Sequence, residues 1–489
     1  MKKVLIANRG EIAVRIMKTL KRMGMSSVAV YSEADADALF VKMADEAISL
    51  GGKTAQESYL RVEKIMDACQ KSGADAIHPG YGFLSEKLEL IRACDEAGVI
   101  FIGPREKAIH LMGDKIESKK LMLSGGVPTI PGFFIDGMDL VSITENAKSI
   151  GYPVMVKAAA GGGGKGLRKV DSSEDLASAI ESCRSEALRS FNDDRVFVEK
   201  FIVNPRHIEV QVFGDSLGQV VGISERECSI QRRNQKVIEE CPSPGVDLEL
   251  RQSLCKAAAD CASLVEYQNA GTVEFVMGED KQFYFLEMNT RLQVEHPVTE
   301  MAHGLDLVEE QIRVAQGLPL SKKLLASTVN RWSLECRIYA EEPLSDFFPC
   351  AGKILKLQFP RECDWLRIDS GVVSGDEISI YYDPMIAKVI TVSDTRLDAV
   401  YKMIQALSEV SIFGIETNVG FLLEVLKSSE FMEARLSTDF IQKYDLISRY
   451  RKTMEDDFVW ASHAGFQISQ KRRSHLCSSE EVFLKGGSQ

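Results

Sequence analysis

The sequence predicts a fold of the α/β and α+β classes, in which a parallel sheet at the N-terminus precedes units built on antiparallel strands. Over residues 1 to about 112, short apolar strands such as 2–7 and 27–31 alternate with helical stretches, which is typical of a parallel sheet. Farther along, the β-branched and aromatic runs 271–277 and 282–286 flank a polar turn that contains glycine. That pattern predicts an antiparallel hairpin.

Size and composition narrow the function. With 489 residues, 45% of them hydrophobic, the chain can bury large cores and should hold two or three domains. A formal net charge of −12 argues against a general binder of nucleic acids or anionic membranes. No apolar run suits a signal peptide or a membrane span, and the 11 cysteines form no C-x-x-C pair, which indicates reduced thiols. We therefore expect a soluble cytoplasmic protein that binds neither nucleic acid nor membranes.

The predicted hairpin gathers oxygen ligands on one face. Because side chains alternate along a strand, a turn centred near residue 280 places Glu274 opposite residue 285 or 287, and either register puts Glu274 and Glu287 on the same face. Asn289 follows two places later. These oxygens suit a hard divalent cation, although an exposed polar face with ordinary cross-strand pairs has the same pattern. If the chain stays extended, the polar face continues through Arg291, Gln293 and Glu295.

A glycine-rich loop, residues 161–166, joins the predicted strands 153–157 and 167–170. Its backbone N–H groups could fold over phosphates, and a lysine at the loop and one in the preceding strand suit the same ligand; the alternative is a plain flexible hairpin tip. A later strand, 196–202, is predicted to run on to 207–213. Its end offers backbone groups that could read an adenine edge.

A basic cluster at 231–236 stands out in this acidic chain. It predicts an anion site, or else a solvated face whose arginines pair with Glu239 and Glu240. A third unit is predicted to begin near residue 331 and to carry Arg337 in a short strand. From about residue 450 the periodicity is lost, which is typical of a mobile tail.

Taken together, these ordered motifs resemble the ATP-grasp superfamily, and specifically biotin carboxylase. The motifs that carry the resemblance are 6–13, 78–86, 112–115, 161–166, 231–236, 287–297 and 335–338. The similarity runs from residue 2 to about 445. It implies an N-terminal domain over 1–112, an ATP-grasp domain over 113–330 with a lid at about 132–203, a C-terminal domain over 331–446, and a flexible tail over 447–489.

The resemblance also implies which residues hold the nucleotide and the metal. It assigns ATP contacts to Lys115, Lys157, Gly161, Gly162, Gly163, Gly164, Lys165, Gly166, Glu199, Lys200, Ile202, His207 and Gln231. It assigns Mg²⁺ or Mn²⁺ to Glu274, Glu287 and Asn289. In many family members a glycine stands at Ala160, an arginine at Lys165 and a histidine at Asn234, so these three positions depart from the common pattern.

For the acceptor side, the resemblance implies a bicarbonate site and a biotin site. Bicarbonate is assigned to Lys236, Arg291, Gln293 and Val294, with Glu295 as the base that deprotonates it. Arg337 and Tyr81 are assigned to biotin. The implied activity is ATP-dependent carboxylation of biotin through carboxyphosphate. It is the first half-reaction of an acetyl-CoA, other acyl-CoA or pyruvate carboxylase.

The same resemblance implies partners. No Ala-Met-Lys-Met biotin-attachment sequence occurs in the chain. We therefore expect biotin on a separate carrier protein and a separate carboxyltransferase subunit. A homodimer is implied by the resemblance alone. Two alternatives remain: another ATP-grasp ligase, in which an amine attacks the acyl phosphate, and an ATP-binding subunit without catalysis. The residues that favour biotin carboxylase over the first are Lys236, Arg291, Glu295 and Arg337.

Overall fold

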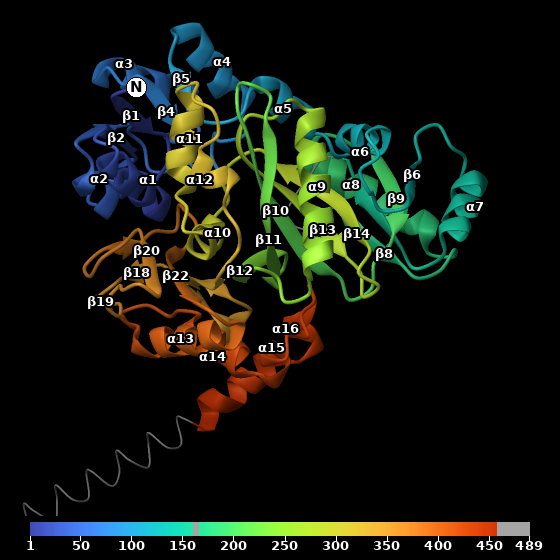
Figure 1. Ribbon diagram of the computed structural model, residues 1–489. Helices are drawn as coiled ribbons and strands as arrows, with labels where there is room; N and C mark the ends of the chain where they lie inside the picture. Colours follow the sequence, from blue (N-terminus) through green and yellow to red (C-terminus); the bar gives the residue numbers. More distant parts are fainter. Residues whose placement is uncertain (160–165, 457–489) are drawn as a thin grey trace, which may run out of the picture.

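The structure is a computed structural model that describes residues 1–159 and 166–456. Three larger sheets organise it (Figure 1). The first is the parallel five-stranded sheet predicted at the N-terminus, in the order β3-β2-β1-β4-β5. Its strands are β1 (Lys3–Ile6), β2 (Ser26–Tyr31), β3 (Glu46–Ser49), β4 (Ala76–His78) and β5 (Ile100–Phe101). The parallel pairing confirms the predicted class of this region.

Helices cover this N-terminal sheet. In α1 (Gly10–Arg22) the residues Ile12, Ile16 and Leu20 recur at helical spacing and are buried, as the periodicity predicts. The first turn of α1 also carries Glu11, a buried carboxylate that lines a cavity together with Tyr81. The other helices of this region are α2 (Leu39–Met43), α3 (Val62–Ser72), α4 (Leu88–Ala97), α5 (Glu106–Met112) and α6 (Lys115–Ser124).

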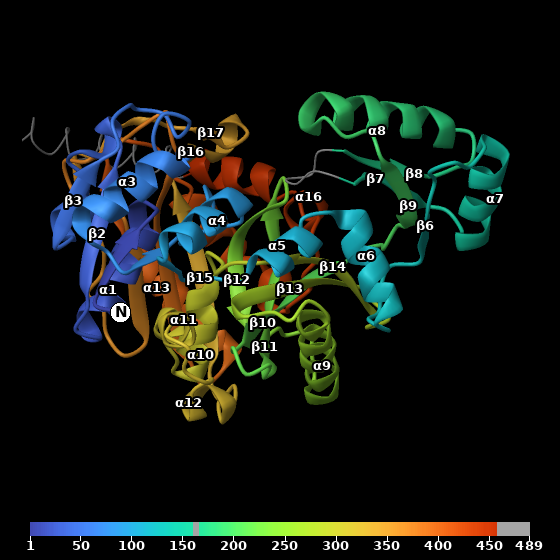
Figure 2. The ribbon, with the colours of Figure 1, turned by 90° about the horizontal axis from the view of Figure 1, so that it is seen from above.

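A small antiparallel sheet in the order β6-β9-β7-β8 projects to one side of the molecule, with α7 and α8 beside it (Figure 2). Its elements are β6 (Gly132–Phe134), α7 (Leu140–Ile150), β7 (Val154–Ala158), β8 (Leu167–Val170), α8 (Leu176–Phe191) and β9 (Val196–Lys200). Strands β7 and β8 pair antiparallel, so the predicted strand–loop–strand is confirmed for the two strands. The glycine-rich loop itself, with Ala160 and Gly161 to Lys165, lies outside the described residues.

The large sheet has eight strands in the order β14-β13-β10-β11-β12-β15-β22-β20. They are β10 (Arg206–Gly214), β11 (Val220–Arg232), β12 (Gln235–Cys241), β13 (Asn269–Met277), β14 (Phe283–Asn289), β15 (Trp332–Tyr339), β20 (Leu366–Ser370) and β22 (Met385–Ser393). The prediction of one strand running from 196 to 213 is wrong: β9 ends at Lys200, and β10 belongs to this other sheet. The strand that carries Arg337 also pairs directly with β12, so the third unit has no main sheet of its own.

Helices α9 (Leu248–Leu264), α10 (His296–His303) and α11 (Leu307–Ala315) contact strands of the large sheet, and α12 (Lys322–Leu325) follows them in the chain. Helix α13 (Arg396–Glu409) packs on β22 and β15. It is followed by α14 (Val419–Lys427), α15 (Ser429–Met432) and α16 (Phe440–Lys443). Shorter elements complete this region: β16 (Glu341–Glu342), β17 (Phe348–Pro349), β18 (Gly352–Lys353), β19 (Lys356–Gln358), β21 (Glu377–Ile378) and β23 (Ser411–Phe413).

The end of the described chain departs from expectation. Residues 446–456 are helical, and the ring of Tyr450 lies 6.0 Å from that of Phe421 in an edge-on arrangement. The prediction of a flexible tail from residue 447 is therefore wrong for residues 447–456, because apolar packing holds this helix on α14. Residues 457–489 lie outside the described part. Among the residues described, no helix has the length and apolar character needed to cross a membrane.

Candidate active site

The hairpin predicted over residues 271–286 is formed by β13 and β14, and it has one of the two registers that the sequence allowed. Strands β13 and β14 pair antiparallel with Glu274 directly opposite Glu287. A shift in register between Glu274 and Phe275 selects residue 287 as the partner of Glu274. Asn289 is the last residue of β14, and its amide nitrogen donates to Glu274 Oε1 at 2.9 Å. The three predicted metal ligands therefore lie together.

Beyond Asn289 the chain does not stay extended, so the condition for a polar strand face that continues through Glu295 is not met. Residues 290–295 form an irregular segment that turns into α10. This turn brings Gln293 and Glu295 back towards the sheet, where both are buried. Arg291 instead donates to Glu86 at 2.9 Å and to the amide oxygen of Asn289 at 3.0 Å.

Lys236 lies at the centre of the site, in the basic cluster predicted to bind an anion. Its ammonium is 2.9 Å from Glu274 and 2.7 Å from Glu295, and it also pairs with Glu209. A further donor bond of 3.1 Å reaches the amide oxygen of Gln293. Burial lowers the pKa of Lys236, but the three carboxylates outweigh it and hold that pKa well above its usual value. Lys236 is therefore a fixed positive charge.

The alternative pairing of this cluster with Glu239 and Glu240 is not what the structure shows. Arg232 pairs with Glu341 at 2.6 Å, and Arg233 pairs with Asp346. Glu240 instead receives Arg396 at 2.7 Å.

Glu295 lies between two cations. Its Oε1 faces Lys236, and its Oε2 accepts from Arg337 at 2.9 Å. Arg337 is shared, because the same guanidinium nitrogen lies 2.5 Å from Glu239. Burial alone would raise the pKa of Glu295, but Lys236 and Arg337 hold it well below its usual value. Glu295 is therefore an ionised carboxylate here.

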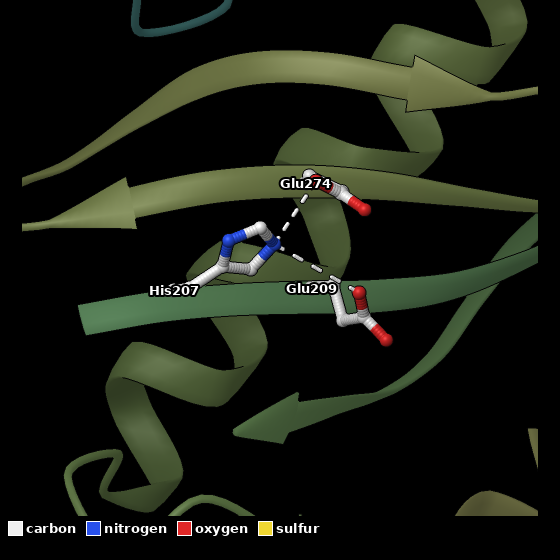
Figure 3. Close-up of side chains that lie close together, drawn as sticks. All are labelled: His207, Glu209 and Glu274. Carbon is white, nitrogen blue, oxygen red and sulfur yellow. Dashed lines mark ion pairs between the residues drawn. The ribbon is translucent and has the colours of Figure 1, made fainter. Parts of the chain in front are cut away.

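His207, Glu209 and Glu274 form a cluster with the spacing of a metal site, as Figure 3 shows. His207 Nε2 lies 2.9 Å from Glu274 and 3.9 Å from Glu209. The ammonium of Lys236, however, already contacts both carboxylates. The Lys236 ammonium lies between Glu209 and Glu274 and would repel a divalent cation placed there, so this cluster is an ion-pair network, and a cation at Glu274 would have to lie on its Glu287 side.

The residues on the Glu287 side do fit a divalent cation. Within the described residues Glu287 has no ion-pair or hydrogen-bond partner. Burial and the facing charge of Glu274 raise its pKa. A cation between these two carboxylates would relieve that repulsion. Asn289 presents its nitrogen to Glu274 and its oxygen to Arg291, so it would join the ligands after its amide turns.

On the nucleotide side, lysines converge on Glu199. The Lys157 ammonium lies 2.7 Å from this buried carboxylate, and Lys119 pairs with it as well. Lys115 begins α6 and lines the same cavity. Glu199 thus holds lysines in place, and its side chain is not free to read a base. The Lys200 ammonium points away and donates to the carbonyl oxygen of Gly151 at 2.7 Å.

Three adjoining cavities are lined by the residues of the site. The central one has a volume of about 380 Å³, and most of the charged residues line it, among them Lys115, Lys157, Glu287, Glu295 and Arg337. A second, of about 520 Å³, shares His207 and Gln231 with the first and extends past Lys200 and Ile202. A third, of about 540 Å³, shares Arg291, Val294 and Arg337 and reaches Tyr81. Asn234 lines the first two cavities.

Of the predicted nucleotide residues, Gly166 immediately precedes β8, and its carbonyl oxygen accepts from Ala158 N at 2.9 Å. Gln231 donates to the carbonyl oxygen of Cys228 at 2.7 Å and lies 3.1 Å from His207. Gly161 to Lys165 cannot be placed, since they lie outside the described residues.

Sequence reasoning missed several charged groups of the site. They are Glu11, Glu86, Lys119, Glu209, Arg226, Glu239 and Lys388. One signal was present: His207, Glu209 and Gln211 alternate along β10, and a buried polar row at strand spacing indicates a site rather than a solvent face. For Lys388 the sequence offers no comparable signal, because it sits in an otherwise apolar strand.

The fold and this acid-rich, lysine-lined site define an ATP-dependent ligase of the ATP-grasp class. Three family models match the chain in order: the biotin carboxylase N-terminal domain over residues 1–109, the ATP-binding domain of the carbamoyl-phosphate synthase L chain over 114–323, and the biotin carboxylase C-terminal domain over 335–443.

Solved structures agree with these matches. Biotin carboxylase from Campylobacter jejuni is 44% identical, with a TM-score of 0.87, over 90% of this chain and 98% of that one. The biotin carboxylase domain of the Hydrogenobacter thermophilus 2-oxoglutarate carboxylase is 43% identical, with a TM-score of 0.86, over 91% and 98%. The chain belongs to the biotin carboxylase family, so the predicted family, fold and enzyme class are confirmed.

Curated relatives are longer proteins. The alpha subunit of rat methylcrotonoyl-CoA carboxylase is 48% identical over 96% of this chain and 66% of the relative. The human propionyl-CoA carboxylase alpha chain is 50% identical over 90% of this chain and 60% of the relative. The chain thus spans 60% to 66% of the length of these two relatives.

Proposed function

We propose that the chain uses ATP and bicarbonate to carboxylate biotin held on a carrier protein, as the first half-reaction of a biotin-dependent carboxylase. One observation carries the proposal. Glu295 is fixed between Lys236 and Arg337, where the central cavity meets the cavity that reaches Tyr81. A base placed there can take a proton from an anion in the central cavity, while the arginine stabilises negative charge on a second substrate in the other cavity.

ATP and Mg²⁺ occupy the central cavity and its neighbour in this proposal. Lys115 and Lys157, which line the central cavity, bind the phosphates. The base lies in the cavity with Lys200 and Ile202, against backbone groups rather than the Glu199 side chain. Glu274 and Glu287, joined by Asn289, hold Mg²⁺ or Mn²⁺, which neutralises phosphate charge when bound.

Bicarbonate binds between Lys236 and Arg291, with Gln293 and the Val294 N–H as further partners. All four line the central cavity beside Glu295. Bicarbonate is a weak nucleophile, so Glu295 removes its proton while the two cations offset the charge that develops. Because Lys236 then faces bicarbonate as well as Glu295, its hold on this carboxylate weakens, and Glu295 becomes a stronger base than it is in the empty site.

The activated bicarbonate oxygen attacks the γ-phosphorus, the bond from that phosphorus to the ADP oxygen breaks, and carboxyphosphate forms. This species decays to CO₂ and phosphate, and the phosphate takes the proton from biotin N1. The deprotonated N1 then attacks the carbon of CO₂, which gives carboxybiotin and hydrogen phosphate. Arg337 stabilises the negative charge on the ureido oxygen of biotin, and Tyr81 lines the same pocket. Water would hydrolyse the intermediate, so a closed site also protects it.

The partners follow from the same reaction. Biotin on a carrier protein must visit this site and then a carboxyltransferase. Relatives named as methylcrotonoyl-CoA and propionyl-CoA carboxylases support an acyl-CoA as the final acceptor, in preference to pyruvate. One neighbour is described as a biotin carboxylase domain dimer, which supports a homodimer here.

Phosphate release from MgATP tests the proposal. The purified chain is given bicarbonate and free biotin, singly and together. Release that requires bicarbonate and increases with biotin is expected. ATP binding without bicarbonate-dependent release would contradict it, and release driven instead by a carboxylate with an amine would indicate a different ATP-grasp ligase.

A further inference from the structure

The two peptide groups on either side of Val294 are held from behind by buried side chains. His296 Nδ1 lies 2.7 Å from the carbonyl oxygen of Gln293, and Lys388 Nζ donates to the carbonyl oxygen of Val294 at 2.8 Å. A carbonyl oxygen only accepts, so His296 carries its proton on Nδ1. Both side chains are fully buried. They hold consecutive carbonyls of the turn that leads into α10.

In the described part of the chain, Glu11 is the one carboxylate within ion-pair distance of Lys388. Lys388 lies on β22, opposite Asp369 of β20. Asp369 already receives both arms of Arg367, at 3.0 and 2.6 Å. The carboxylate that Lys388 contacts is Glu11 of α1, at 3.0 Å, and the same oxygen of Glu11 accepts from the Tyr81 hydroxyl. The lysine thus connects the Tyr81 wall of the third cavity to the Val294 turn.

Peptide geometry makes these two bonds consequential. A trans peptide is planar, and its N–H points opposite to its carbonyl. Fixing the oxygen of Gln293 therefore fixes the direction of the Val294 N–H. Fixing the oxygen of Val294 likewise orients the peptide from which the Glu295 side chain departs. Within the part of the chain described, the Val294 N–H donates to no protein group, and Val294 lines the central cavity.

We infer that His296 and Lys388 are positioning residues that set the affinity for bicarbonate. They aim the Val294 N–H and the Glu295 carboxylate into the cavity without touching the substrate themselves. The inference rests on the proposed function. It gives a reason for burying an ammonium, which is costly unless its partners are well placed.

Two matched pairs of variants test this inference. An asparagine places its amide nitrogen where His296 has Nδ1, whereas a glutamine places it nearer Nε2. We expect His296→Asn to keep the KM for bicarbonate close to the unaltered value, and His296→Gln to raise it by ~10-fold or more, as for loss of a buried hydrogen bond. The KM for MgATP should stay unchanged in both.

For the lysine, the double variant Lys388→Met/Glu11→Gln removes both buried charges together and leaves neither uncompensated. We expect its bicarbonate KM to rise ~10- to 100-fold with MgATP binding retained, as for loss of a charged donor. Lys402→Met is the control, because Lys402 also holds a strand carbonyl, that of Val392 at 3.2 Å, away from the cavities. It should leave both KM values unchanged.

Two results would overturn the positioning role of His296 and Lys388. An equal rise in the two KM values, or a lower melting temperature with an unchanged bicarbonate KM, would show a purely structural role. If the double variant does not fold, the comparison of His296→Asn with His296→Gln still tests the inference. A measurement on the unaltered chain distinguishes failure of the proposed function from failure of the positioning role. If the unaltered chain shows no bicarbonate-dependent phosphate release, the proposed function is overturned, and the positioning role falls with it.

Discussion

The ammonium of Lys236 lies 2.7 Å from the carboxylate of Glu295, and both side chains line the same cavity. The pair neutralises itself, and a carboxylate held by a lysine is a weak base. In the proposed mechanism, bicarbonate therefore enters between these two side chains before proton transfer begins. We expect deprotonation to depend in this way on the presence of the anion, and ATP cleavage to be slow when bicarbonate is absent.

Glu295→Gln should abolish bicarbonate-dependent ATP cleavage. The amide keeps the shape and one acceptor oxygen but cannot take a proton, so a loss of ~100-fold or more is expected for removal of a general base. MgATP binding should remain, because Glu274 and Glu287 are untouched. Phosphate release measures the ATP cleavage, and titration with nucleotide measures the binding of MgATP. Turnover near that of the unaltered chain would remove Glu295 from the role of base.

Arg337→Ala should impair carboxylation of biotin more than binding of MgATP. Loss of a charged donor to the ureido oxygen is expected to slow carboxylation ~10- to 100-fold. Arg251→Ala is the control, because it also removes an arginine from a buried carboxylate, Glu225 at 2.7 Å, but outside the three cavities. Equal losses of carboxylation and ATP binding in Arg337→Ala would indicate a structural role instead.

Glu287→Gln should raise the Mg²⁺ concentration needed for half-maximal ATP cleavage. A neutral amide removes one of two facing charges, and a rise of ~10- to 100-fold is typical for loss of an ionic partner. Glu279→Gln, in the exposed turn of the same hairpin, should leave the Mg²⁺ dependence as it is. An unchanged Mg²⁺ requirement in Glu287→Gln would place the metal elsewhere.

The stability of the chain should depend on pH through Glu239. Burial raises the pKa of Glu239 to about 7, although Arg337 opposes this. The folded chain then binds this proton more tightly than the unfolded chain, so stability is lost as pH rises from the unfolded value of about 4.3 towards 7. Glu239→Gln removes that loss.

The variant should therefore gain stability relative to the unaltered chain across this pH range, by on the order of 3 kcal/mol at pH 8. Urea unfolding at pH 5, 6, 7 and 8 measures the difference. A difference that stays constant with pH would show that Glu239 does not titrate between the two states.

Local rules predicted the parts of the site that lie close together in sequence. Strand alternation and one turn were sufficient to place Glu274 and Glu287 on the same face, whereas the register shift that pairs them directly was not predicted. The irregular segment after Asn289 was not predictable in this way, since Gln293 and Glu295 reach the site by turning rather than by extension. Their presence at the site was expected, but the backbone that delivers them was not.

These rules could not predict which residues far apart in the sequence lie next to one another in the fold. Glu239, Arg337 and Lys388 meet because β12, β15 and β22 are adjacent in the large sheet, although they lie about 150 residues apart from first to last. Periodicity identifies strands but not their order in a sheet. For the same reason the strand over 196–202 could be expected, whereas its separation from β10 into another sheet could not.

Transfer of label from ¹⁴C-bicarbonate to biotin tests the central claim most directly. The chain is incubated with MgATP, labelled bicarbonate and free biotin, and acid-labile carboxybiotin is then measured. Label on biotin that requires ATP and is lost in Glu295→Gln is the expected result. Bicarbonate-dependent ATP cleavage in which biotin never acquires label would contradict it, and would show that the activated carboxyl group is passed to another acceptor.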